Sequence, residues 1–223
     1  MERLVAISLP STGNEFFHKR IEEVRSFLKE VEYDHSAITL DEFGRVLHVE
    51  NRTPGEVVRT MKGTCLDGVF YSASKLKDVF GEDMITIVPF VQRRDRMGRF
   101  SEMCTGTPHG MYLFSIDGCY GAMSVSREPL LRFLSPVYEE IEDLVMSPQI
   151  LRGYAKLTRD KKERFLGIMF FREEIRDSFP DYDRIPNFRT KGKKEPMRKQ
   201  LMFGEAKRVP EAREYLDLVL ALD

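Results

Sequence analysis

The chain has 223 residues, of which 42% are hydrophobic and 32% charged, and its 35 basic and 36 acidic side chains sum to a formal charge of −1. This composition is typical of a globular protein with a sizeable core, and the near-zero charge excludes steering of partners by the overall field. The longest apolar runs are far shorter than the ~20 residues of a membrane-spanning helix, and no secretory signal is recognisable. We therefore expect a soluble, cytoplasmic protein with no membrane partner.

The N-terminal 31 residues predict a strand and then a helix. Residues 3–9 are a short apolar run that ends at Pro10, as a buried strand does. Thr12 and Glu15 have the spacing of a capping box, and the apolar residues behind them recur every three or four positions, which indicates an amphipathic helix. This helix would bury Phe17, Ile21, Val24, Leu28 and Val31.

The next forty residues complete a recognisable order of elements. Residues 37–40 and 45–50 predict a hairpin, Thr53 and Glu56 predict a capped helix, and residues 68–73 predict a strand. The resulting order, βαββαβ, is that of the ferredoxin-like motif, in which two helices cover one face of a four-stranded antiparallel sheet. The sequence therefore predicts an α+β fold for the front of the chain.

Further antiparallel strands extend this front. Residues 84–91 predict a strand in which Pro89 marks an edge or a bulge. Residues 111–116 and 120–125 predict a hairpin, because the Asp117-Gly118 pair between them is a strong two-residue turn signal.

From about residue 126 the pattern changes to helices. Residues 165–171 are ambiguous between a helix and a buried strand, and we favour a helix because charged residues flank them at helical spacing. A last helix opens at Pro210 and would bury Leu216, Val219 and Leu220. Helix-like segments also follow Ser126, Ser135, Ser147 and Thr158. We thus expect an α+β domain over 1–126 and a mostly helical part over 127–223, which can form one continuous domain with the first.

The densest charge lies in residues 184–199, RIPNFRTKGKKEPMRK, with seven cations and one acid. Its prolines and glycine predict an exposed loop. Because neutralised phosphates release counterions, a polyanion is the natural partner of such a loop. The residues expected to contact it are Arg189, Lys191, Lys193, Lys194, Arg198 and Lys199.

A second basic cluster falls in the polar loop predicted over residues 93–106. Guanidinium groups hold phosphates through two hydrogen bonds each, so a group of arginines favours anion contact. The cluster consists of Arg93, Arg94, Arg96 and Arg99. The two clusters together indicate a non-catalytic protein that binds the phosphate backbone of RNA or DNA with little base specificity.

Two other functions remain open. The basic loop can instead dock on an acidic protein surface, which would make the chain an assembly or adaptor protein. The chain offers such a surface itself, in a predicted helix that carries Glu139, Glu140, Glu142 and Asp143. Concentration-dependent self-association would distinguish this function from nucleic-acid binding.

The third function is enzymatic and depends on two histidines. His35 and His109 each precede a predicted strand, where a pair of histidines can act as general base and general acid on a phosphodiester. This arrangement, together with the strand and helix of the first 45 residues, faintly resembles the two-histidine phosphoesterases related to RNA ligases. The family carries a threonine two positions after each histidine, whereas this chain has Ala37 and Met111 there.

No cofactor or metal site is expected. Cys104, His109 and Cys119 have C-x4-H-x9-C spacing and Cys65 could supply a fourth ligand, but structural zinc sites usually carry paired ligands on tight knuckles. The chain also contains no phosphate-binding glycine loop, dinucleotide fingerprint or nucleophile elbow.

Overall fold

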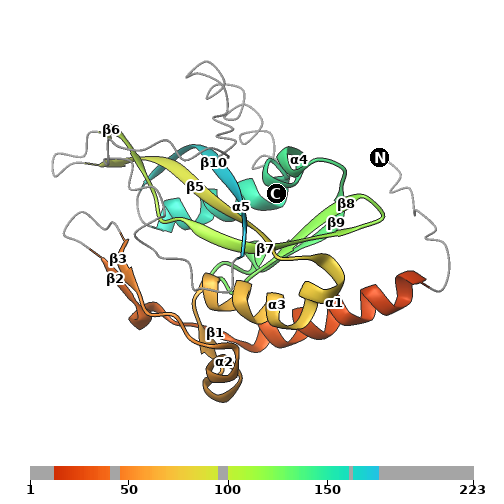
Figure 1. Cartoon of the computed structure of the whole chain (residues 1–223). Coiled ribbons are helices and arrows are strands. Elements are labelled where there is room, and N and C mark those ends of the chain that lie inside the picture. The colour runs from red at the N-terminus through yellow and green to blue at the C-terminus, as the bar shows by residue number, and fades with distance from the viewer. Residues whose placement is uncertain (1–12, 41–45, 95–99, 161–162, 176–223) are drawn as a thin grey trace.

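A computed structural model describes residues 13–40, 46–94, 100–160 and 163–175 (Figure 1). The predicted strand at 3–9, the basic loop at 184–199 and the predicted C-terminal helix lie outside these residues. The described chain is α+β, with a six-stranded antiparallel sheet and two separate two-stranded ones. None of the helices within the described ranges is both long and apolar enough to cross a bilayer.

The helices are α1 (Gly13–Glu30), α2 (Pro54–Thr60), α3 (Cys65–Phe80), α4 (Ile141–Val145) and α5 (Pro148–Asp160), with 3₁₀ turns at His35–Ala37 and Pro129–Leu131. The small sheets pair β1 (Glu32–Tyr33) with β4 (Lys62–Gly63) and β2 (Ile38–Leu40) with β3 (Val46–Val49). The main sheet contains β5 (Asp83–Arg94), β6 (Phe100–Thr105), β7 (His109–Ile116), β8 (Cys119–Met123), β9 (Phe133–Tyr138) and β10 (Arg164–Glu174).

The main sheet is organised around β5. The strand order of the sheet is β10-β5-β7-β8-β9. On one side of β5, β7 pairs with its first half and β6 pairs with its second half. The break between β6 and β7 coincides with Pro89, which has no N–H to donate. The Pro89 carbonyl instead accepts a hydrogen bond of 2.7 Å from the Gly106 N–H. Residues 84–91 thus lie in a strand as predicted, but β5 is not an edge strand, because it pairs with β10 on one side and with β7 and β6 on the other.

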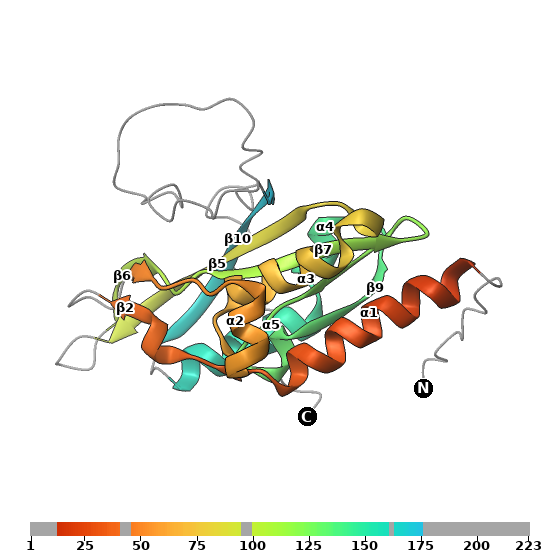
Figure 2. The ribbon, with the colours of Figure 1, turned by 60° about the horizontal axis from the view of Figure 1, so that its bottom comes forward.

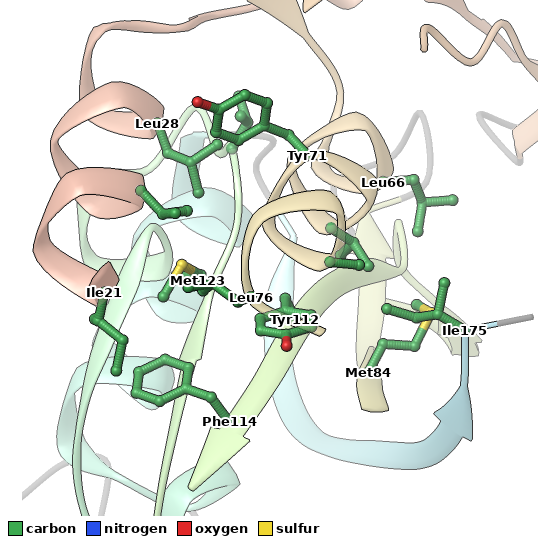
Figure 3. Close-up of a cluster of buried hydrophobic side chains, with 14 of the residues drawn as sticks. Ile21, Leu28, Leu66, Tyr71, Leu76, Met84, Tyr112, Phe114, Met123 and Ile175 are labelled. Carbon is green, nitrogen blue, oxygen red and sulfur yellow. The ribbon is translucent and has the colours of Figure 1, made fainter. Parts of the chain in front are cut away.

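Helices cover both faces of the sheet (Figure 2). On one face, α1 and α3 pack over β7, β8 and β9 and bury a cluster that includes Leu28, Leu76, Tyr112 and Phe114 (Figure 3). On the other face, α4 and α5 bury a second cluster built around residues such as Ile87. Residues of the two clusters alternate along each strand, because successive side chains of a strand point to opposite faces of the sheet.

Several local predictions are confirmed. The periodic residues Ile21, Val24 and Leu28 form the buried stripe of α1, and Val31 is buried directly after its end. The α2 helix has the reciprocal capping box of Thr53 and Glu56. The β7–β8 hairpin turns at Asp117 and Gly118 with φ angles of 52° and 82°, the left-handed values that a two-residue turn requires. Residues 38–40 and 46–49 also pair as an antiparallel hairpin.

The strand predicted at residues 68–73 is wrong, because these residues form the middle of α3. A second capping box, between Thr64 and Asp67, starts this helix, and Leu66, Val69, Ala73 and Leu76 are buried along one side. The βαββαβ order thus lacks a strand at that place, and the ferredoxin-like arrangement is not confirmed.

Four predictions after residue 93 are also wrong. Residues 100–105 form β6 and not a loop, the segment after Ser135 is β9, and Thr158 lies inside α5. Residues 165–171 belong to β10 and not to a helix. The β10 strand has apolar side chains on both faces, which removes the alternation that identifies a half-exposed strand.

The described residues on both sides of position 126 share one sheet, since β9 and β10 pair with β8 and β5. The part of residues 127–223 that the structure describes contains these two strands as well as α4 and α5. A mostly helical C-terminal part is therefore not confirmed.

A close approach of α3 to the segment after β8 yields a stability prediction. A Cβ atom at Gly68 in α3 would lie 2.5 Å from the backbone nitrogen of Val125, whereas one at Gly55 in α2 would meet nothing within 4 Å. We expect Gly68→Ala to lower the free energy of unfolding by about 2–3 kcal/mol because α3 must move away from this segment. Gly55→Ala should raise it by about 0.5–1 kcal/mol, since alanine favours a helix. Urea unfolding with an unchanged m-value is the measurement, and equal effects at both sites would contradict the prediction.

Candidate functional site

The residues predicted to contact phosphate fall largely outside the described ranges. This holds for all six in the basic loop: Arg189, Lys191, Lys193, Lys194, Arg198 and Lys199. It also holds for Arg96 and Arg99. Arg93 and Arg94 are the last two residues of β5.

The pairing of β5 with β6 places Arg93 and Arg94 where the two strands meet. Arg94 is opposite Phe100, so only five residues connect the two strands. Paired residues in an antiparallel ladder have Cα atoms about 5 Å apart, and consecutive Cα atoms are about 3.8 Å apart.

Strand β10 adds a second basic segment to this cluster. Arg164, the first residue of β10, is opposite Gln92 of β5. The Glu163 N–H donates to the Thr158 carbonyl at 2.8 Å, which joins the end of α5 to the start of β10. Arg164, at the end of the sequence RDKKER (159–164), thus lies beside the end of β5. We call residues 93–99 and 159–164 the basic end; together they hold eight cations and three carboxylates.

Sequence reasoning missed the contribution of residues 159–164. Their charge is visible in the sequence, but only the pairing of β10 with β5 brings them to residues 93–99. Because residues 165–171 were interpreted as a helix, nothing in the predicted order linked the two segments.

The opposite end of the sheet is acidic. We call residues 82–83, 139–143 and 173–174 the acidic end, which holds eight carboxylates. Two of these carboxylates are ion-paired with neighbouring cations, Asp83 with Arg172 and Glu82 with Lys77. These residues share one end because β5 starts there, β10 ends opposite Asp83, and β9 ends opposite Tyr120 beside the β7–β8 turn. Glu139 and Glu140 precede α4, so the four acids at 139–143 do not all lie on one helix as predicted.

The two ends are too far apart to neutralise each other. A strand rises about 3.3 Å per residue, so the twelve residues of β5 separate the ends by about 36 Å. At physiological ionic strength the Debye length is about 8 Å. Each end therefore presents its own field, although the whole chain is nearly neutral.

The two histidines have different surroundings. His109 is buried, and its Nε2 donates to the Leu131 carbonyl at 3.1 Å. Burial lowers the pKa of His109 to about 4, so the ring is neutral at physiological pH. His35 is exposed and its ring lies edge-on to Tyr33. The phosphodiesterase function stays a prediction, and the surroundings of His109 do not favour an acid–base role.

The cysteines that were considered as metal ligands do not form a cluster in the described residues. Cys65 and Cys119 are free thiols, and burial raises the pKa of Cys65 to about 11. No group of three or more His, Cys, Asp and Glu side chains within the described ranges has the geometry of a metal site.

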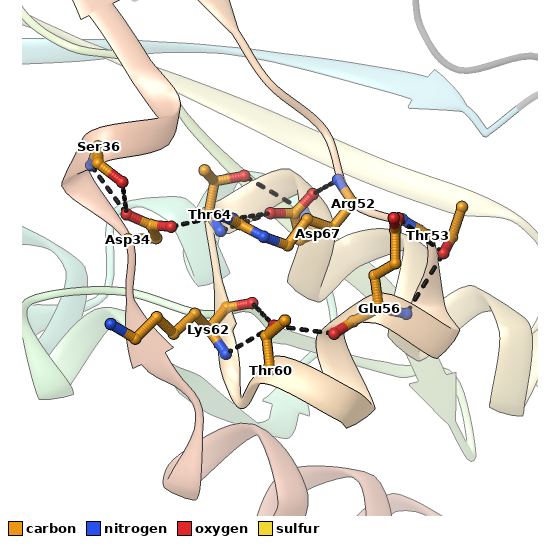
Figure 4. A network of polar contacts seen from close by, with 9 residues as sticks. All are labelled: Asp34, Ser36, Arg52, Thr53, Glu56, Thr60, Lys62, Thr64 and Asp67. Carbon is orange, nitrogen blue, oxygen red and sulfur yellow. Dashed lines mark hydrogen bonds and ion pairs between the residues drawn. The ribbon is translucent and has the colours of Figure 1, made fainter.

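A buried polar network ties the small β1–β4 sheet to α3 (Figure 4). Asp67 is fully buried, and its carboxylate accepts hydrogen bonds from the backbone N–H groups of Arg52 and Thr64, both at 2.7 Å. The Arg52 guanidinium bonds Asp34 and lies 3.7 Å from Asp67. Asp34 also accepts from Ser36. One arginine thus holds two carboxylates from distant parts of the chain.

The electrostatics of this network indicate a structural role. Burial raises the pKa of Asp67 despite its backbone donors. Hydrogen bonds from Ser36 and Arg52 lower the pKa of Asp34. Both carboxylates accept hydrogen bonds from the chain itself, so the network positions α2 and α3.

No protein-family model matches the chain, and no curated protein is significantly similar to it in sequence.

The network makes stability depend on pH through Arg52. Arg52→Met keeps most of the apolar stem but leaves Asp34 and Asp67 without a cation. We expect a loss of about 2–4 kcal/mol at pH 7, since breaking a buried pair strands the remaining charges. Because the ion pairs exist only with ionised carboxylates, the loss should shrink as the pH falls through the usual carboxyl range towards 3.

Urea unfolding of both proteins between pH 7 and pH 3 measures this dependence. Arg59→Met, at an exposed position of α2, is the matched control and should change stability by less than about 0.5 kcal/mol. If the stability lost in Arg52→Met stays constant with pH, Arg52 stabilises the fold through packing of its side-chain stem and not through charge pairing.

Proposed function

We propose that this chain is a non-catalytic protein that binds the phosphate backbone of nucleic acid. The basic end supplies one contact surface, and the basic segment 184–199 supplies further cations. Lysine and arginine contacts to phosphate give affinity without reading bases, so we expect little sequence preference.

The observation that carries the proposal is the separation of charge along β5 and β10. Their antiparallel pairing brings Arg94 and Arg164, distant in sequence, to one end of the sheet and leaves the acids at the other. Four of the eight cations are arginines within residues 93–99, and arginine is the residue best suited to bidentate phosphate contact. A surface of this kind attracts a polyanion even though the chain as a whole carries no net positive charge.

Binding of fluorescent single-stranded RNA and duplex DNA across a salt series tests the proposal. We expect the logarithm of the binding constant to fall linearly with the logarithm of the salt concentration. The triple variant Arg93→Glu, Arg94→Glu, Arg96→Glu should weaken binding at least about tenfold and reduce the salt slope by about 3, one for each phosphate that is no longer neutralised.

The matched control reverses three exposed cations on other elements: Lys19→Glu, Lys29→Glu and Arg59→Glu. It changes the net charge by the same amount and should alter affinity less than about twofold at physiological salt, where distant charges are screened. Equal reductions in both variants, or no binding at low salt, would contradict the proposal.

The charge separation also favours a second candidate, head-to-tail self-association. A basic end that docks on the acidic end of a second copy forms a heterologous contact, which continues into open chains unless the geometry closes a ring. The chain would then act as an assembly protein, with the acids at 139–143 as part of the docking surface.

Sedimentation at rising protein concentration and low salt tests this candidate. We expect assemblies that dissociate with salt and do not form in either the Arg93/Arg94/Arg96 variant or a variant with Glu139→Lys, Glu140→Lys and Glu142→Lys. Mixing these two variants should restore association, because each then presents the charge that the other lacks. A monomer at every concentration would exclude self-association and leave nucleic-acid binding as the function to test.

A further inference from the structure

The main sheet is irregular at one level, where three breaks in its pairing coincide. Pro89 of β5 has no N–H for a ladder, and β6 ends there, since the Gly106 N–H bonds the Pro89 carbonyl. On the other side of β5, β10 has a bulge between Phe165 and Gly167, and Gly167 is opposite Phe90. Bulges are over-represented next to active sites, because they open a ladder and redirect side chains.

A hollow lies at this level, between the sheet and the second half of α5. Pro89 and Val91 line it from β5, and Tyr154, Leu157 and Thr158 line it from α5. Its volume is about 280 Å³ including its open mouth. Sites that enclose a whole ligand usually measure roughly 300–1,000 Å³, so we expect only one edge of a ligand to enter this hollow.

The lining combines an apolar surface with hydrogen-bond acceptors. The Thr158 hydroxyl donates its proton to the Tyr154 carbonyl at 2.9 Å, so its oxygen presents lone pairs. The Glu163 N–H donates to the Thr158 carbonyl at 2.8 Å, and this bond holds Glu163, an acceptor when ionised, in the lining. A ligand edge that fits therefore belongs to a flat, largely apolar group and carries N–H donors.

The hollow is next to the basic end. Val91 is two residues before Arg93, and Glu163 directly precedes Arg164, which is opposite Gln92. A nucleic-acid strand whose phosphates contact this end has its bases within reach of the hollow. Unpaired bases can turn out of the stack and expose their hydrogen-bonding edges, whereas a base in a duplex is stacked and paired.

We propose that the hollow takes the edge of one unpaired adenine or cytosine, and that the partner of the basic end is therefore single-stranded. Both bases carry an exocyclic amino group that donates to acceptors such as Glu163 and Thr158, whereas uracil has a carbonyl oxygen at the same place. This inference rests on the proposed function and adds a modest base preference to the phosphate contacts.

Binding of fluorescent oligonucleotides that contain only adenine, only cytosine or only uracil tests the inference at one salt concentration. We expect the full chain to bind the adenine and cytosine oligonucleotides at least about fivefold more tightly than the uracil one, since one good contact to a base edge discriminates by about 1–3 kcal/mol. The ratio of these affinities is the readout, because a general change in electrostatic attraction affects all three equally.

Glu163→Gln keeps the shape of the side chain but replaces one carboxylate oxygen with an amide donor. We expect it to reduce the preference for adenine and cytosine to less than about twofold. Glu173→Gln, near the other end of β10, changes the net charge by the same amount and is the matched control, which should keep the preference of the unmodified chain.

A second measurement needs no polymer. The ¹⁵N-labelled chain is titrated with AMP, CMP and UMP, and we expect AMP and CMP, but not UMP, to shift the amide signals of Leu157, Thr158 and Glu163.

Equal affinity for the three oligonucleotides would overturn the inference, as would a preference that survives Glu163→Gln or tighter binding of a duplex. Binding that weakens linearly in log salt would still support the proposed function in each of these cases. If no oligonucleotide binds at low salt, both the proposed function and the base site are overturned.

Discussion

The pairing of β5 with β10 is the constraint on which the rest of the structure depends. Ten positions are matched between Asp83–Glu174 and Gln92–Arg164, and β5 is the only described strand that β10 contacts by a ladder. This pairing decides which chain segments meet at each end of the sheet. It separates basic from acidic residues by the full length of β5, so the surface charge follows from the register of two strands.

A register is well determined here because both faces of these strands are apolar and covered. Slipping β10 by one residue would exchange Ile168 and Phe170, which face α5, with Met169 and Phe171, which face the other side. The side chains differ in shape, so the exchange would disrupt the packing of two layers at once. The position of Arg164 beside Gln92 is thus fixed by packing far from the charges themselves.

The sequence predicted elements whose signals are local. The stripe of α1, the capping box of α2 and the Asp117-Gly118 turn each depend on residues a few positions apart, and all three are confirmed. The failures at residues 68–73 and 165–171 share a cause. Gly68 serves a close approach of α3 to Val125, and β10 is apolar on both faces, so in each case a tertiary contact decided the structure.

In the candidate site, too, the sequence predicted the features that depend on neighbouring residues and missed those that depend on tertiary contacts. Arg93 and Arg94 could be identified from sequence because the arginines are adjacent, and the structure adds that they end β5. The contribution of residues 159–164 could not, because it depends on a pairing between segments far apart in the chain. The network around Arg52 was missed for a related reason, since Asp34, Arg52 and Asp67 carry no motif and meet only when α2 and α3 are in place.

The order in which the strands leave the ribosome has a consequence for synthesis. β5 and β10 are separated by roughly 70–90 residues of sequence, and such long-range pairing is slow because loop closure must precede its stabilising contacts. Until residues 164–174 have been translated, β5 presents an unpaired apolar edge to solvent or to a neighbouring nascent chain. The growing polypeptide is therefore exposed to misassociation during synthesis of its second half, and the basic end exists only after β10 has closed the sheet.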